Sequence, residues 1–117
     1  INNSSIGDLG EQYAVLCLHL RGAEVFTNSV RTGSADLMMH YKNKTYPIDV
    51  KVARPIFAKG LRKTYWESTK AYTVKAPVIP LIVVPETGAD MSGWYCRWLE
   101  TKKGPRHVPE ELKDFWK

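Results

Sequence analysis

The chain has 117 residues, 44% of them hydrophobic and 25% charged, with a formal net charge of +5, which fits one soluble globular domain over residues 1–117. No apolar run approaches the ~20 residues of a membrane-spanning helix, so no membrane association is expected. The two cysteines form no CxxC pair and have no metal-ligand spacing with the histidines, which argues against structural zinc. The N-terminal residues lack the basic and apolar segments of a secretory signal, so a cytoplasmic protein is expected.

The chain begins with a predicted helix and a short strand. From Gly7 to Arg21, apolar residues recur at helical spacing, and Ser4 or Ser5 is the candidate cap at the start. Gly22 suits the end of this helix, because glycine readily adopts the left-handed backbone found there. Residues 24–30 are then expected to form a short strand.

Two further strands are expected after an exposed turn at 31–33. Residues 35–41 and 45–52 are rich in apolar and β-branched side chains and are separated by Lys42-Asn43-Lys44. Because asparagine tolerates the left-handed backbone of tight hairpin turns, these two strands are predicted to pair.

The second half is expected to contain a mobile loop, a helix, a buried strand, another strand and a short terminal helix, at 53–64, 65–76, 77–86, 93–100 and 109–117. Pro, Gly and basic residues in the first of these segments indicate the loop. The whole order predicts an α/β or α+β domain in which a mixed sheet is flanked by helices.

All the excess positive charge lies in one segment. Between Lys51 and Lys75 there are seven basic residues and one acid, Glu67, whereas the rest of the chain has a net charge of −1. Such a block suits a surface that binds a polyanion, and the alternative is a solvated charged face.

Three charged residues stand out in the predicted strand pair. Side chains two apart on a strand share a face, so Asp49 and Lys51 point together, away from their apolar neighbours. A two-residue turn at Lys42-Asn43 or Asn43-Lys44 brings Asp36 opposite Asp49 or Lys51 on that face. A three-residue loop without a bulge sends Asp36 to the opposite face.

Two carboxylates and a lysine on one face suit metal-dependent phosphodiester hydrolysis. The carboxylates repel each other unless a cation lies between them, and Mg²⁺ prefers such oxygen ligands. A lysine beside them can orient the attacking water or stabilise developing charge. The alternative is that Asp36 caps a turn while Asp49 and Lys51 are charge partners on a solvated face.

Asp36, followed after twelve residues by Asp49-Val50-Lys51 with apolar Ile48 before it, resembles the signature of the PD-(D/E)xK nuclease superfamily. The segment GDLGEQYAVLCLHLRGAEVFTNSV at 7–30 is similar to the first helix and strand of that family. GSAD at 33–36 matches its Gly-Ser-x-Asp segment, although alanine stands where the name-giving proline would be. The resemblance is greatest to archaeal Holliday-junction resolvases and to the PD-(D/E)xK homing endonucleases.

The resemblance implies a restriction-endonuclease-like mixed sheet flanked by helices, and a role for each matched residue. Asp36, Asp49 and the main-chain carbonyl of Val50 would bind Mg²⁺, for which Mn²⁺ is expected to substitute. Glu11, on the first helix, would contact the metal directly or through water. Lys51 would be the catalytic lysine.

Candidate DNA contacts surround this motif. Ser34 is expected near the scissile phosphate by the resemblance, and Arg31 lies on the turn before the site. Basic residues after the motif would neutralise backbone phosphates, which supplies most sequence-independent affinity: Arg54, Lys59, Arg62 and Lys63.

Together these observations predict a Mg²⁺-dependent endodeoxyribonuclease, with cleavage of branched DNA favoured over reading of base sequence. Because one site cuts one strand, a homodimer or higher oligomer is expected. The alternatives are a homing or restriction-type endonuclease of the same superfamily, and a catalytically inactive nucleic-acid-binding module on the same scaffold. A domain that binds an acidic protein is a further alternative.

Overall fold

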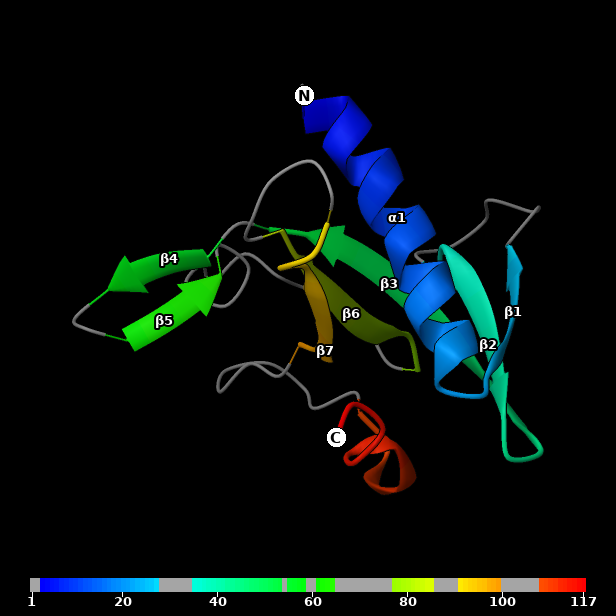
Figure 1. Ribbon diagram of the computed structural model, residues 1–117. Helices are drawn as coiled ribbons and strands as arrows, with labels where there is room; N and C mark the ends of the chain where they lie inside the picture. The colour runs from blue at the N-terminus through cyan, green and yellow to red at the C-terminus, as the bar shows by residue number, and fades with distance from the viewer. Residues whose placement is uncertain are drawn as a thin grey trace.

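A five-stranded sheet carrying one long helix forms the centre of the molecule (Figure 1). The computed structural model describes residues 3–27, 35–53, 55–58, 61–64, 77–85, 91–99 and 108–117. The elements in these ranges are α1 (Asn3–Leu20), β1 (Glu24–Thr27), β2 (Leu37–Tyr41), β3 (Lys44–Val52), β4 (Pro55–Ala58), β5 (Leu61–Thr64), β6 (Ile79–Val84), β7 (Tyr95–Trp98) and the 3-10 helix η1 (Glu110–Leu112).

The sheet is mixed and open, with strand order β1-β2-β3-β6-β7. β3 and β6 are parallel, whereas the other neighbours in the sheet are antiparallel. The predicted strands at 35–41, 45–52, 77–86 and 93–100 are confirmed, each with slightly different ends. One helix beside a mixed sheet is consistent with the α/β class.

Helix α1 begins earlier than the sequence pattern predicts. It starts at Asn3, so Ser4 and Ser5 lie in its first turn and the prediction that one of them is the cap is wrong. Serine is tolerated there because the first amide groups of a helix have no partners within the helix. The prediction for Gly22 is confirmed, since its φ of 92° is in the left-handed region just after the last turn.

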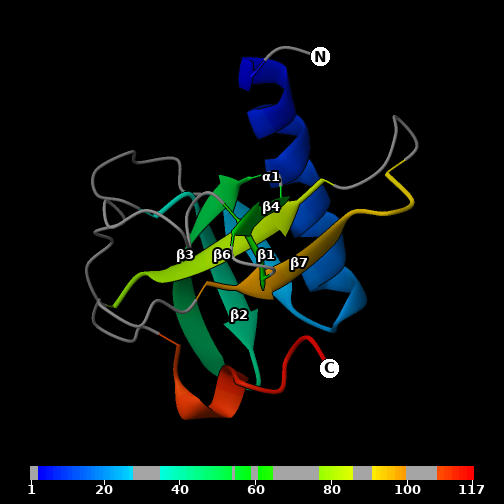
Figure 2. The same cartoon turned by 90° about the vertical axis from the view of Figure 1, so that its left-hand side faces the viewer.

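Helix α1 covers one face of the sheet, as Figure 2 shows. Ala14 and Leu18 are fully buried against a large apolar cluster that includes Leu37, Ile48 and Leu81. The helix approaches β3 so closely at Gly10 that an added Cβ would overlap the side chain of Val52. No helix in the described ranges is both long and apolar enough to cross a bilayer.

The opposite face of β3 and β6 is also buried at its centre. Ile82 and Val84 have no exposed surface and form a second apolar cluster with Ala53 and Leu99. Burial on both faces explains why every residue of β6 is buried and why this strand is a continuous apolar run.

The expected loop at 53–64 contains a β-hairpin instead. Antiparallel β4 and β5 pair with Ile56 opposite Lys63 and Phe57 opposite Arg62, and this two-stranded sheet is separate from the five-stranded one (Figure 1). Pro55 is the first residue of β4, where its missing N–H is tolerated, so the proline does not prevent a strand. The predicted turn at 31–33 and the helix at 65–76 lie outside the described residues.

The C-terminal segment is anchored to the body of the protein by hydrogen bonds. Trp98 Nε1 donates to the carbonyl of Leu112 over 2.8 Å, and Arg21 Nη1 donates to the carbonyl of Lys117 over 2.9 Å. The prediction of a helix throughout 109–117 is wrong in extent, because only Glu110–Leu112 form a 3-10 turn. Aromatic packing holds the residues after it, with the rings of Trp98 and Phe115 5.5 Å apart.

Candidate active site

The β2–β3 hairpin sets the position of Asp36 relative to Asp49. Tyr41 pairs with Lys44, so the turn consists of two residues, Lys42 and Asn43, both with positive φ. The same register pairs Leu37 with Ile48, at the start of β2. Asp36 precedes this pair on one segment and Asp49 follows it on the other, so the two residues are neighbours where the pairing of β2 with β3 ends. The two-residue turn predicted from the sequence is confirmed. Because regular pairing stops before Asp36, its expected place on the same face as Asp49 stays a prediction.

Asp36 is fastened to β3 by both its main chain and its side chain. Its amide donates to the carbonyl of Ile48 over 2.8 Å, and its Oδ2 accepts a hydrogen bond from the amide of Val50 over 2.9 Å. Regular pairing of β2 with β3 ends at Leu37. Further along β3, the amide of Val50 donates to the carboxylate of Asp36 in place of a main-chain carbonyl. Its position is thus fixed beside the main chain of Val50.

Asp49 is the one buried charged side chain among the residues that the structure describes. Only 4% of Asp49 is exposed, and its Oδ2 lies 3.5 Å from Lys51 Nζ, whose side chain is one-third exposed. Removing a carboxylate from water is costly unless a cation and hydrogen bonds compensate. The sheet therefore holds a desolvated negative charge and a partly exposed positive charge next to Asp36.

Main-chain geometry adds a third oxygen to this group. In an extended strand the N–H and C=O of one residue project toward the same neighbouring strand. Because the N–H of Val50 points to Asp36, the carbonyl of Val50 projects to that side too. Two carboxylates and one carbonyl are hard oxygen donors of the kind Mg²⁺ prefers, so the residues present fit that ion.

Glu11 does not complete a cluster of three carboxylates. Across the described ranges, no three or more His, Cys, Asp or Glu side chains are grouped so that they could hold a metal ion. Glu11 follows Gly10, which packs on Val52, so it lies on α1 near the end of β3.

Most of the candidate DNA contacts cannot be placed. Arg31, Ser34, Arg54 and Lys59 lie outside the described residues. Arg62 and Lys63 lie on β5, in register with Phe57 and Ile56.

A second cation lies on the same face as Lys51, and the sequence interpretation missed it. Lys51 pairs with Ile82, and Ile82 pairs with Arg97, so these three residues form one row across β3, β6 and β7. Cys96 and Trp98 point into the cluster beneath α1, which places Arg97 on the other face. Alternation in the segment YCRW was the available signal, but the pairing of β7 with β6 could not be known.

A search of family models, of curated proteins and of solved structures found no match to this chain.

Proposed function

We propose that the protein is a metal-dependent DNA endonuclease with a restriction-endonuclease-like fold of the PD-(D/E)xK type. The observation that carries the proposal is the buried carboxylate of Asp49, which lies 3.5 Å from Lys51 Nζ and directly precedes Val50, whose amide donates a hydrogen bond to Asp36 Oδ2. Burying a carboxylate in an ion pair costs more desolvation free energy than forming the same pair on the solvated surface, and it gives the fold no extra stability in return. A cation-binding role explains why the charge is kept.

Each residue of the site has a distinct part in this chemistry. Asp36 and Asp49, with the carbonyl of Val50, would hold Mg²⁺ or Mn²⁺, which polarises a phosphoryl oxygen and lowers the pKa of water when bound. Lys51, with one-third of its side chain exposed, orients the attacking water and stabilises negative charge that develops on the phosphate. Burial of Asp49 lowers the local dielectric and strengthens these interactions.

DNA is the proposed substrate because the excess positive charge is concentrated in the segment of sequence that follows the site. The segment from Lys51 to Lys75 contains seven basic residues and one acid, and its first residue is the proposed catalytic lysine. Contacts with backbone phosphates give affinity without reading sequence, so cleavage that depends on DNA structure, as in Holliday-junction resolvases, is favoured. Two such domains in a homodimer would place one site on each strand.

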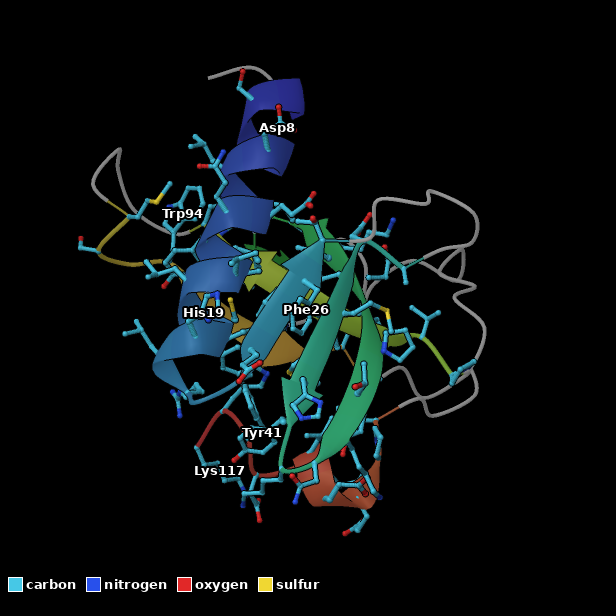
Figure 3. The ribbon with its side chains drawn as sticks, turned by 90° about the vertical axis from the view of Figure 1, so that its right-hand side faces the viewer. Asp8, His19, Phe26, Tyr41, Trp94 and Lys117 are labelled. Atoms are coloured by element: carbon cyan, nitrogen blue, oxygen red, sulfur yellow. The ribbon has the colours of Figure 1, made fainter. Side chains whose placement is uncertain are left out.

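Cleavage assays with a matched pair of variants test this function. Linear duplex, four-way junction and flap DNA are incubated with Mg²⁺ and the wild-type chain, Asp49→Asn or Asp8→Asn. Asp8 is an exposed carboxylate on α1, labelled in Figure 3. We expect cleavage by wild type and Asp8→Asn, with the junction preferred, and a loss of at least about a hundredfold in Asp49→Asn. Equal cleavage by Asp49→Asn and wild type would contradict the proposal, while a preference for one duplex sequence would indicate a homing or restriction-type enzyme.

A catalytically inactive DNA-binding module is the second candidate. It is favoured by one observation, that Glu11 does not join Asp36 and Asp49 in a group of three acidic side chains. This alternative predicts that the wild-type chain cuts none of the three DNAs but binds them in a salt-dependent manner.

A further inference from the structure

An apolar row of side chains crosses the face that carries Asp49. Phe26 pairs with Met38 and Met38 pairs with Pro47, so the three side chains stand side by side on β1, β2 and β3. Their neighbours Val25, Leu37 and Met39 pack in the cluster beneath α1, which places the row on the opposite face. Phe26 is 55% exposed, and Met38 and Pro47 are partly exposed.

This row is adjacent to the candidate active site. Pro47 and Asp49 are two residues apart on β3, and Met38 pairs with Pro47. Two residues along a strand span about 7 Å on the same face. A nucleotide whose phosphate lies at the two carboxylates therefore has its sugar and base within reach of the row.

The size and chemistry of the row suit one nucleobase. Three neighbouring strands span only about 10 Å. A stable contact between two copies of the chain buries about 800 Å² on each partner, and a row of three side chains offers far less surface than that. A phenyl ring flanked by a thioether and a proline ring presents flat, apolar surface, on which any base can stack. The outer face of α1 also exposes leucines, Leu16 and Leu20, but it lies on the other side of the sheet.

We propose that Phe26, with Met38 and Pro47, stacks on an unpaired base next to the phosphate bound at Asp36 and Asp49. This inference rests on the proposed nuclease function and specifies its substrate class, DNA with an unpaired nucleotide beside the cleaved bond. A base inside a duplex offers no free ring face, so only an unpaired or extruded base can reach the row. The row therefore selects structure without reading sequence.

Binding measured without metal tests the stacking role separately from cleavage. The full chain is titrated in EDTA against a duplex with a short bulge that contains 2-aminopurine, and against the fully paired duplex. We expect Phe26→Ala to weaken binding to the bulged DNA about tenfold, to weaken binding to the paired duplex less than about twofold, and to abolish the change in 2-aminopurine fluorescence. Phe26→Trp should retain all three properties of the wild type.

A control variant and a change in salt complete the test. Leu20→Ala truncates a side chain that is 77% exposed on α1 and should alter neither affinity. Because stacking releases few counterions, the effect of Phe26→Ala should persist at high salt, whereas overall affinity falls. Equal weakening of both DNAs by Phe26→Ala, no weakening of either, or a change in oligomeric state on its substitution would overturn the proposal. If the wild type cuts no DNA but Phe26→Ala still weakens binding to the bulged DNA selectively, the stacking surface is supported and the nuclease function is contradicted. If the wild type cuts DNA but Phe26→Ala has no such selective effect, the nuclease function is supported and the stacking surface is contradicted.

Discussion

At the scale of single residues, Asp36 combines a structural role with a proposed catalytic one. Its Oδ2 accepts a hydrogen bond from the amide of Val50, the residue that follows the buried Asp49. The two roles need different properties of the side chain, since any oxygen acceptor satisfies the amide but only a carboxylate binds a divalent cation strongly. Two substitutions can therefore separate them.

We expect Asp36→Asn to keep an oxygen for the amide of Val50 and to change the free energy of unfolding by less than about 0.5 kcal/mol, while reducing cleavage at least about a hundredfold. Asp36→Ala leaves that partly buried amide without its side-chain acceptor and should lose about 1–3 kcal/mol of stability. Urea unfolding and the junction assay measure the two effects. Wild-type cleavage by Asp36→Asn would exclude a metal-binding role for this residue.

Lys51 is expected to stabilise the fold through Asp49. Lys51→Met removes the cation 3.5 Å from a carboxylate that is almost fully buried, and the loss should be about 1–2 kcal/mol, less than for a fully buried pair because Lys51 is partly exposed to solvent. In the double variant Lys51→Met with Asp49→Asn, the buried negative charge is gone and most of that stability should return. A double-mutant cycle of urea unfolding measures the coupling, and additive losses would show that the two side chains do not interact.

At the scale of the elements, the contact of α1 with β3 fixes the helix over the end of β3 that carries the site. Gly10 is the closest point, because its missing Cβ leaves room for Val52. Gly7, one turn earlier, has no atom within 4 Å of an added Cβ. The two glycines lie in the same helix and differ in the space around them, so they form a matched pair.

Gly7→Ala should stabilise the protein by about 0.5–1 kcal/mol, since alanine favours the helix and meets no neighbour. Gly10→Ala gains the same propensity but forces Val52 or the helix to move, and a net loss of about 1–2 kcal/mol is expected. Adding Val52→Ala to Gly10→Ala should make that alanine favourable relative to Val52→Ala alone. Thermal unfolding of the four variants tests this, and equal effects of the two glycine substitutions would contradict the close approach.

The pairing that forms the site could be predicted from the sequence, but the contacts beyond it could not. The period of two on β3 and the asparagine in the turn were sufficient to predict the two-residue turn and the pairing of β2 with β3 up to Leu37 and Ile48. The hydrogen bond to Val50 depends on where regular pairing of β2 stops, and no local pattern encodes that point. The row of Lys51 and Arg97 depends on non-local strand order, which is set by burial on both faces of β6.

The β4–β5 hairpin was missed for a different reason. Pro55 and Gly60 are typical of loops, yet the first lies at a strand start and the second lies between the two strands in sequence. Position within an element decides whether these residues break it. Composition alone therefore could not distinguish a basic loop from a basic hairpin.

At the scale of the whole molecule, three weak acids are built into the packing between elements. Tyr13 on α1 donates a hydrogen bond to the carbonyl of Trp94 over 2.6 Å, which connects the helix to the segment before β7. Burial and neighbouring thiols raise the pKa of Tyr13 to about 12, and burial is the main cause of the raised pKa of Cys96. Burial and the hydrogen bond to Glu111 raise the pKa of Tyr46 as well.

These shifts predict that the fold is lost on the alkaline side. When the pKa of a group is higher in the folded protein than in the unfolded chain, both states keep the proton below the unfolded pKa, and stability does not depend on pH there. Above the unfolded pKa the unfolded chain ionises while the folded protein does not, so the free energy of unfolding falls as the pH rises. For Cys96 that unfolded value is 9.0, and for the two tyrosines it is 10.0. The free energy of unfolding should therefore be flat with respect to these groups up to pH about 8 and should fall between pH about 9 and 12.

Substitution of Cys96 isolates the first part of this fall. Each group that is ionised in the unfolded chain but protonated in the fold lowers stability by about 1.4 kcal/mol per pH unit, so Cys96→Val should reduce the slope between pH 9 and 10 by up to that amount. Tyr13→Phe should leave that interval unchanged and reduce the slope between pH 10 and 12, while costing about 1 kcal/mol at neutral pH through loss of its bond to Trp94. Urea unfolding at a series of pH values measures both slopes. An unchanged slope in Cys96→Val would mean that the thiol ionises at the same pH in the folded and unfolded states, which contradicts the effect of burial on its pKa.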